Sequence, residues 1–213
     1  MIKGLRRLEY RGYDSAGVAL INTDGELNVY KTKGKVDNLC EYCNDKNVSG
    51  TVGIAHTRWA THGEPSSRNA HPHYSQSHNL AIIHNGIIEN YADIKEKLKA
   101  KDVQFKSDTD TEVLVQLIEY VMVKKNLSLL EAVQVALYQV IGAYAIAVFQ
   151  IHHLVGIFHN RTGIGTDKEL IFADTHHQRT LLTGSHNLIG ITLVEYGNGV
   201  STDHLVKRHL HRL

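Results

Sequence analysis

The predicted order of strands and helices is the feature that most limits what this chain can fold into. Residues 16–32 (AGVALINTDGELNVYKT) are two extended runs on either side of an Asp-Gly pair, a pattern typical of a β-hairpin. Apolar runs at residues 52–55, 80–84 and 143–149 predict further buried strands. Two adjacent helical segments precede the last of these runs. Several strands, two adjacent helices and another strand favour a layered α+β fold.

Both helices have recognisable first turns. Thr109 with Glu112, and Ser128 with Glu131, show the S/T-x-x-E spacing of a capping box, in which hydroxyl and carboxylate satisfy unpaired backbone N–H groups. Gly142 is expected to end the second helix. Apolar residues recur at helical spacing after each start, and we expect them in the core. They are Val113, Leu114, Leu117, Ile118 and Val121, and then Leu130, Val133, Leu137 and Ile141.

Composition indicates one domain that handles small molecules. A chain of 213 residues with 42% apolar residues can bury one substantial core. The 23 basic and 22 acidic residues leave a net charge of +1, which gives no broad field to attract nucleic acid or an anionic membrane. No apolar run has the length that spans a bilayer, and the opening MIKGLRRLEY lacks the apolar stretch of a secretion signal. We expect a cytoplasmic protein that binds neither nucleic acid nor a membrane.

Two groups of residues raise the question of a metal site. Cys40 and Cys43 form a C-x-x-C pair, which occurs as a redox pair or as half of a zinc site. Because no second pair completes four ligands, we expect two incidental thiols near a surface turn. Nine of the fifteen histidines lie in residues 152–211, but their spacings favour a solvated or irregular segment over a metal-binding tail. We expect no metal and no other cofactor.

Three polar motifs lie at or after the predicted strands. They are HTRWATHGEPS at residues 56–66, NAHPH at residues 69–73 and HNGIIEN at residues 84–90. They gather cationic, aromatic, hydroxyl, imidazole and amide groups around glycines, which suits binding a small polar ligand better than filling a core. The motifs therefore mark the candidate binding site.

These motifs, with GLRRLEYRGYDSAG at residues 4–17 and SDTDTE at residues 107–112, closely resemble the glutaminase domain of the glutamine-fructose-6-phosphate aminotransferases, a family of class II glutamine amidotransferases. The similarity runs from Met1 to about Phe149. It implies that residues 1–150 are a type 2 glutamine amidotransferase domain with the N-terminal nucleophile hydrolase fold. That fold is an αββα sandwich, in which two antiparallel sheets lie between helix layers.

The resemblance also implies an activity. The family hydrolyses L-glutamine and passes the ammonia to sugar-isomerase domains, which make glucosamine 6-phosphate from fructose 6-phosphate. A homodimer is a further expectation for the intact family.

Amide hydrolysis needs a nucleophile, a base and donors aimed at the oxygen that becomes negative. The resemblance assigns the Asn85 side-chain N–H and the Gly86 backbone N–H to this oxyanion hole. From the dipeptide alone, an Asn-Gly turn after a strand is the better interpretation. Arg58 is assigned to the carboxylate of glutamine and Asp110 to its ammonium group. An acid in a first helical turn also offsets the helix dipole without a ligand, so that alternative stays open for Asp110.

Four further residues are assigned by resemblance. Trp59, Thr61 and His62 lie in the loop that closes over bound glutamine, with Thr61 and His62 as ligand contacts, and Arg11 lies near the nucleophile. Packing and loop hydrogen bonds are the alternative roles for residues of these types. Three other histidines are expected to be structural and to satisfy loop carbonyls: His71, His73 and His84.

The chain also departs from the family. The family attacks glutamine with an N-terminal cysteine whose amino group is the base, whereas this sequence opens with MIKG, inside the family's first helix. We therefore expect a domain truncated at its first strand, an inactive fragment without nucleophile or sugar-isomerase domains. Residues 151–213 are interpreted as a divergent or frame-disturbed remainder of the same domain. The alternative function is a non-catalytic glutamine-binding module.

Overall fold

The computed structural model describes residues 1–50, 52–150, 153–159 and 192–193. Among these residues the helices are α1 (Ile2–Leu8), the short 3₁₀ helix η1 (Glu9–Arg11), α2 (Val36–Tyr42), α3 (Tyr91–Lys99), α4 (Asp110–Lys125) and α5 (Leu129–Leu137). The strands are β1 (Ser15–Ile21), β2 (Leu27–Lys33), β3 (Val52–Arg58), β4 (His73–Tyr74), β5 (Leu80–Ile88), β6 (Gly142–Gln150), β7 (His153–His159) and β8 (Thr192–Leu193).

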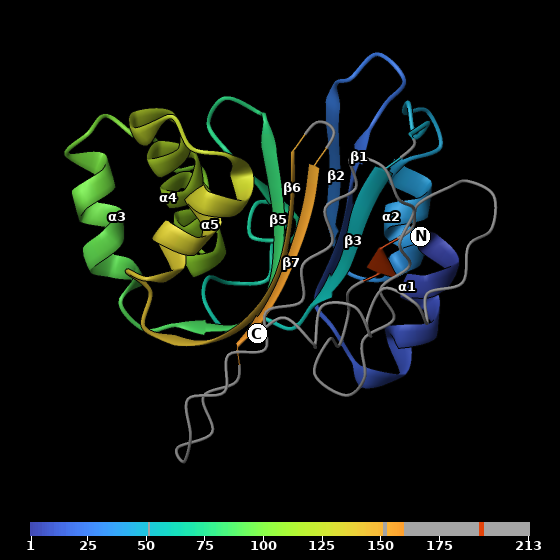
Figure 1. The fold of residues 1–213 in the computed structure, drawn as a ribbon. Helices are drawn as coiled ribbons and strands as arrows, with labels where there is room; N and C mark the ends of the chain where they lie inside the picture. The colour runs from blue at the N-terminus through green and yellow to red at the C-terminus, as the bar shows by residue number, and fades with distance from the viewer. Residues whose placement is uncertain (51, 151–152, 160–191, 194–213) are drawn as a thin grey trace, which may run out of the picture.

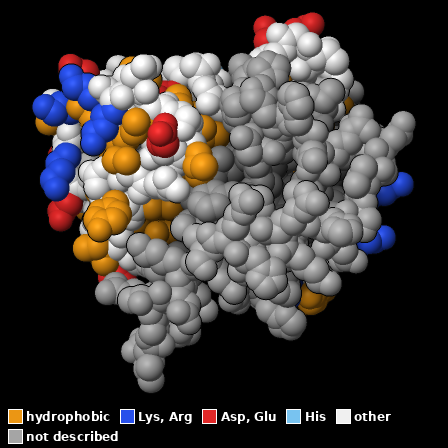
Figure 2. All heavy atoms as spheres, viewed as in Figure 1, with side chains coloured by type: hydrophobic (Ala, Val, Ile, Leu, Met, Phe, Trp, Pro, Cys, Tyr) orange, Lys and Arg blue, Asp and Glu red, His pale blue; other side chains and the backbone are white. Residues whose placement is uncertain are grey.

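The described elements form four layers (Figure 1). One antiparallel sheet has the strand order β2-β1-β3-β8, and the other has the order β4-β5-β6-β7. Helices α1 and α2 cover the outer face of the first sheet, and α3, α4 and α5 cover the outer face of the second. Figure 2 shows acidic, basic and hydrophobic side chains interspersed over this second helix layer. The expected αββα sandwich is confirmed.

Three clusters of buried side chains fill the interfaces between these layers. Successive residues of one strand enter different clusters. In β1, Ala19 packs between the sheets, whereas Val18 and Leu20 pack towards α1 and α2. Both faces of the central strands are therefore apolar, which explains why the sequence shows continuous rather than alternating apolar runs.

The predicted hairpin and buried strands are confirmed. The side-chain oxygen of Asn22 accepts hydrogen bonds from the backbone of Asp24 at 3.0 Å and of Glu26 at 2.8 Å, which closes the connection between β1 and β2. The runs at residues 52–55 and 80–84 belong to β3 and β5, which extend further into the polar motifs than predicted. The motifs therefore begin inside strands of both sheets.

Helices α4 and α5 begin where their caps predict. The side chain of Thr109 accepts a hydrogen bond from Glu112 N, and Ser128 and Glu131 form a complete capping box. The Glu112 carboxylate instead accepts from the backbone of Lys106 at 2.8 Å, so the first cap is not reciprocal. The predicted apolar stripe of α4 is entirely buried.

The predicted end of α5 is wrong. The helix ends at Leu137, and Gly142 is the first residue of β6, with a φ of 141°. The side chain of Asn90 donates to Gln139 O at 2.8 Å and accepts from Ile141 N at 2.9 Å, which holds the intervening turn. Ile141, predicted for the core, is 49% exposed because it lies in this turn.

The two cysteines lie near a surface turn, as predicted, because the chain turns at residues 43–46 directly after α2. Cys40 lies in α2 and Cys43 caps its end, and both thiols are free and half-buried. Within the described residues, no three His, Cys, Asp or Glu side chains gather into a metal-binding group.

No helix in the described part of the chain is long and apolar enough to cross a membrane. Most of the histidine-rich segment lies outside the described residues, so its interpretation stays a prediction.

Candidate functional site

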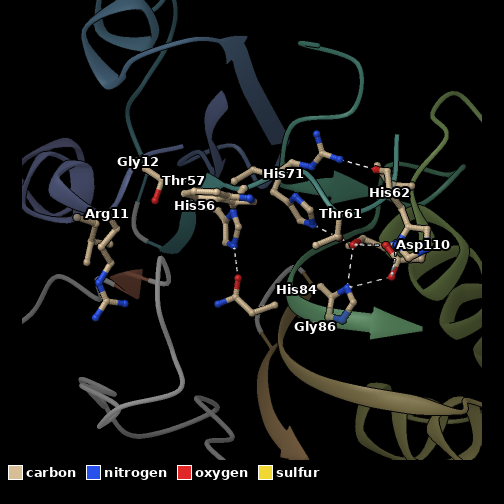
Figure 3. Close-up of a pocket in the computed structure, with 16 residues that line it drawn as sticks. Arg11, Gly12, His56, Thr57, Thr61, His62, His71, His84, Gly86 and Asp110 are labelled. Carbon is tan, nitrogen blue, oxygen red and sulfur yellow. Dashed lines mark hydrogen bonds and ion pairs between the residues drawn. The ribbon is translucent and has the colours of Figure 1, made fainter. Parts of the chain in front are cut away.

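A cavity of about 350 Å³ is lined by residues of β3, the loop after it, β5 and the start of α4. This volume is typical of small-ligand sites. The eight residues proposed from the sequence for catalysis, binding or support all line it (Figure 3): Arg11, Arg58, Trp59, Thr61, His62, Asn85, Gly86 and Asp110. In this view Arg11 and Gly12 lie at one end of the cavity and His62 and Asp110 at the other.

Arg58 is the last residue of β3 and is 3% exposed. Its Nη2 donates to the backbone oxygens of His62 and, at 3.0 Å, of Gly63, while Nη1 lies 3.6 Å from Asp14 Oδ1. Burial lowers the pKa of Arg58, against the effect of Asp14 and Asp110, but a guanidinium stays charged at neutral pH. Nη1 makes no hydrogen bond to a described residue but is ion-paired with Asp14, and the Arg58 side chain lines the cavity.

Asp14 is a site residue that the sequence alone did not reveal. Besides its ion pair with Arg58, its carboxylate accepts hydrogen bonds from the Ser15 hydroxyl at 2.8 Å and from the backbone N–H of Ala60. Asp14 thus holds both the guanidinium and the start of the loop after β3. Its position beside Arg58 follows from the pairing of β1 with β3, which places Ser15 opposite Arg58.

The loop after β3 carries the three residues predicted to close over a ligand. Trp59 is 70% exposed and packs against Gly12, where an added Cβ would lie 3.2 Å from the indole ring. His62 is half-buried, and its Nδ1 lies 3.7 Å from Asp110 Oδ2. Thr61 between them is exposed. The loop therefore offers side chains both to the cavity and to solvent.

Asp110 is the first residue of α4 and is 3% exposed. Its two oxygens accept backbone hydrogen bonds, Oδ2 from Ile88 at 2.9 Å and Oδ1 from Thr111 at 2.9 Å. These bonds fix the carboxylate at the cavity wall. Because Asp110 is also in the first turn of α4, the helix-dipole interpretation is compatible with the same geometry.

Asn85 and Gly86 do not form a turn, so the interpretation favoured by the dipeptide alone is wrong. Both lie within β5, paired with Ala145 and Tyr144 of β6. Gly86 has a φ of 131°, and an added Cβ would lie 2.1 Å from Ala143 O, so the close approach of β6 requires glycine there. The side-chain oxygen of Asn85 lies 2.8 Å from His56 Nε2.

Four histidines, each at most 5% exposed, surround these groups: His56, His71, His73 and His84. The Nε2 of His71 and the Nδ1 of His84 both lie 2.9 Å from Thr111 Oγ1. The expectation that these two bond loop carbonyls is therefore wrong, since a hydroxyl of α4 is their partner. His73 does bond loop backbone, at Asn69.

Burial is the main cause of a lowered pKa in all four histidines. The pKa of His56 falls to about 4, and those of His71 and His73 fall well below 6.5. The pKa of His84 is also lowered, although Asp110 opposes the shift. These imidazoles are uncharged at neutral pH, so they surround Arg58 and Asp110 with neutral polar groups.

Arg11 lies in η1 and is exposed. Its Nε donates to Tyr10 Oη at 2.9 Å, and its guanidinium lies 5.4 Å from the centre of the same ring.

None of the described residues that line the cavity carries a thiol. The cavity therefore combines a buried cation, a buried anion and amide groups, which suits a zwitterion with a polar side chain.

The sequence matches the family model of the glutamine amidotransferase domain over residues 16–189. The chain therefore belongs to the glutamine amidotransferase family. A solved structure, the glutamine phosphoribosylpyrophosphate amidotransferase from B. subtilis complexed with ADP and GMP, aligns with a TM-score of 0.63 and 27% identity. The alignment covers 74% of this chain and 34% of that chain.

Curated relatives give a more specific similarity. The chain is 63% identical to the glutamine–fructose-6-phosphate aminotransferase of Bacteroides thetaiotaomicron over 180 residues, which are 82% of this chain and 29% of that protein. Identity to the aminotransferase of the same name from Haemophilus influenzae is 50% over 163 residues, or 76% of this chain and 26% of that protein. The chain thus spans less than a third of the length of these relatives. The predicted division at residue 150 stays a prediction.

Proposed function

We propose that this chain is the glutamine-binding, ammonia-supplying domain of an aminotransferase that makes glucosamine 6-phosphate from fructose 6-phosphate and glutamine. The observation that carries the proposal is the cavity lined at once by Arg58, Asp110 and the Asn85-Gly86 pair. The names of the relatives supply the acceptor sugar, fructose 6-phosphate.

The two buried charges hold the head of glutamine. The guanidinium of Arg58, which lines the cavity, binds the α-carboxylate. Asp110 binds the α-ammonium group with a carboxylate that Ile88 N and Thr111 N hold in place. Because both partners are preorganised, little ordering is needed when the ligand enters.

The bound head places the side-chain amide of glutamine at β5. There the Asn85 side-chain N–H and the Gly86 backbone N–H donate to the carbonyl oxygen, and donate more strongly as it becomes negative. Trp59, Thr61 and His62 cover the ligand, with Thr61 and His62 in contact with it. Arg11, at the other end of the cavity, lies near the attacking group.

A second candidate, a non-catalytic glutamine-binding module, is favoured by one observation. The described residues that line the cavity include donors for an oxyanion but no thiol to attack the amide. We therefore expect the 213-residue chain on its own to bind glutamine without releasing ammonia. In the aminotransferase, a nucleophile supplied from outside the described residues completes the reaction, and a sugar-isomerase domain of a cytoplasmic homodimer receives the ammonia.

Calorimetry with L-glutamine and two truncated analogues tests the proposal. Glutaramate lacks the ammonium group and 4-aminobutanamide lacks the carboxylate. We expect L-glutamine to bind at micromolar to millimolar concentration and each analogue at least tenfold more weakly, because each leaves one buried charge unpaired. Equal binding of all three ligands, or none, would overturn the proposal.

Ammonia release, measured in the same samples, separates the two candidates. Binding without release supports a module that needs a further part for catalysis. Saturable release by the chain alone would contradict that expectation and would show a complete glutaminase.

A further inference from the structure

The side-chain amide of Asn85 is held by a residue from the opposite sheet. His56 lies in β3, and its Nε2 is 2.8 Å from Asn85 Oδ1 in β5 (Figure 3). His56 is 2% exposed, and both residues line the cavity. The hydrogen bond therefore connects the two sheets directly at the candidate oxyanion hole.

The chemistry of this pair dictates the orientation of the amide. An amide oxygen only accepts hydrogen bonds, so Nε2 must carry the proton of the neutral imidazole. With burial lowering the pKa of His56 to about 4, the ring is neutral at pH 7, and its other nitrogen, Nδ1, has no hydrogen-bond partner among the described residues. Because the amide group is planar, a bond that fixes Oδ1 on one side fixes Nδ2 on the opposite side.

The opposite orientation of the amide would remove the Asn85 donor from the oxyanion hole. If the amide turned over, Asn85 would present an oxygen to the carbonyl oxygen of glutamine, and two acceptors would face each other. An amide alone has little preference between the two orientations, because its oxygen and nitrogen have the same shape. A neighbour that donates to the oxygen gives the amide such a preference, and His56 Nε2–H is a donor of this kind.

We propose that His56 is a positioning residue that locks the Asn85 amide with its N–H towards the carbonyl oxygen of bound glutamine. The inference rests on the proposed function, since it assigns a donor to that function's ligand. His56 acts through Asn85 and contributes to recognition of the amide, not of the zwitterionic head.

A pair of ligands separates this role from a structural one. L-norvaline has the amino-acid head of glutamine and an alkyl chain of the same length, but no amide. His56→Leu is expected to weaken L-glutamine binding by roughly two- to tenfold, the factor of one neutral hydrogen bond, and to leave L-norvaline binding unchanged. His56→Gln, which keeps an N–H donor, is expected to recover part of the glutamine affinity.

His73 provides the matched control. It is 3% exposed and bonds Thr109 Oγ1 at 3.0 Å, but it does not line the cavity. His73→Leu is expected to leave the ratio of glutamine to norvaline affinity as in the wild type. An equal loss for both ligands in His56→Leu, or no loss for glutamine, would overturn the inference. Wild-type protein that binds neither ligand would instead overturn the proposed function itself.

Nitrogen NMR of the wild-type chain tests the inference without any variant. The imidazole of His56 is expected to be the Nε2–H tautomer at pH 7, both with and without L-glutamine. The Nδ1–H tautomer would overturn the inference, because Nε2 would then accept from the amide nitrogen and Asn85 would turn its oxygen to the ligand.

Discussion

At the scale of single residues, the site depends on buried charges that are held before any ligand arrives. Arg58 is fixed by Asp14 and by the backbone oxygens of His62 and Gly63, and Asp110 is fixed by two backbone N–H groups. Removing a buried charge from water is costly unless it is paired or hydrogen-bonded. The residues that hold these charges therefore matter as much as the charges themselves.

Replacement of Asp14 by alanine tests this dependence. Asp14→Ala removes the ion pair with Arg58 and the acceptor for Ala60 N. We expect unfolding in urea to require roughly 1–3 kcal/mol less free energy, because buried donors lose their partner. Calorimetry should show L-glutamine affinity at least tenfold lower.

Asp37→Ala is the matched control, since Asp37 pairs with Arg6 through side chains that are 65% and 51% exposed. We expect little change in stability and none in glutamine affinity. Equal effects of the two variants would contradict the importance of the buried pair.

How far residues could be assigned from the sequence depends on what kind of information identifies them. Arg58, Asp110 and the Asn85-Gly86 pair stand in motifs that resemble a family, and the structure brings them to one cavity. Asp14 and His56 were not assigned, because their importance comes from neighbours in other strands. The spacing of residues along the sequence does not show which residues of different strands lie side by side.

At the scale of elements, β5 has two functions. It lies inside the second sheet, and it carries Asn85 and Gly86 at the cavity. Pairing with β6 continues through both residues, to Ile88 opposite Gly142. The donors are thus part of a rigid strand, which limits how far they can move when a ligand binds.

Gly86→Ala tests the close approach of β5 and β6. The added Cβ would meet Ala143 O at 2.1 Å, and alanine rarely adopts a φ of 131°. We expect a loss of roughly 2–4 kcal/mol in the free energy of unfolding, from strain and displaced backbone together, measured by urea titration.

Gly25→Ala controls for the backbone angle alone. Gly25 has a φ of 81°, but nothing lies within 4 Å of its added Cβ. A loss of about 1 kcal/mol is expected. If Gly86→Ala cost no more than this, the close packing of the two strands could not be what requires glycine at position 86.

Elements were predicted where local chemistry determines them. The starts of α4 and α5 follow from the hydroxyls of Thr109 and Ser128, and the hairpin follows from its turn. The end of α5 was misplaced because the glycine expected there belongs to β6, and the Asn90 side chain holds the turn between. Helices α1, α2 and α3 are short, with seven, seven and nine residues, and no capping box of the S/T-x-x-E kind marks their starts.

At the scale of the whole molecule, the cavity joins the two halves of the sandwich. Arg58 comes from the first sheet, Asn85 and Gly86 from the second, and Asp110 from the helix layer outside the second sheet. The layered fold was predictable because continuous apolar runs indicate strands buried on both faces. Which strands lie at the cavity was not, because that depends on how the two sheets face each other.

Acid sensitivity is expected of the whole fold. Histidine in an unfolded chain binds a proton near pH 6.5, whereas buried His56 does so only near pH 4, and His71 and His73 also resist protonation. Between these values the unfolded state binds more protons. The stability that these neutral histidines contribute is therefore fully present above about pH 6.5. It decreases as the pH falls, and each such histidine lowers the folding equilibrium constant by roughly tenfold per pH unit.

Urea titrations at pH 7, 6 and 5 measure this fall. His73→Gln removes one group that binds a proton in the unfolded state but not in the folded state. The stability of this variant should therefore depend less steeply on pH than that of the wild type. His78→Gln, in an exposed position, serves as control and should change the steepness less. Identical pH dependence in wild type and His73→Gln would contradict the role assigned to buried neutral histidines.

The most direct test of the central claim is a crystal structure of this chain with L-glutamine. We predict the ligand's carboxylate within hydrogen-bonding distance of the Arg58 guanidinium and its ammonium group beside Asp110. Its side-chain carbonyl oxygen should accept from Asn85 Nδ2 and Gly86 N. Glutamine bound outside this cavity, or bound with its amide at Arg58 and its head at β5, would contradict the account.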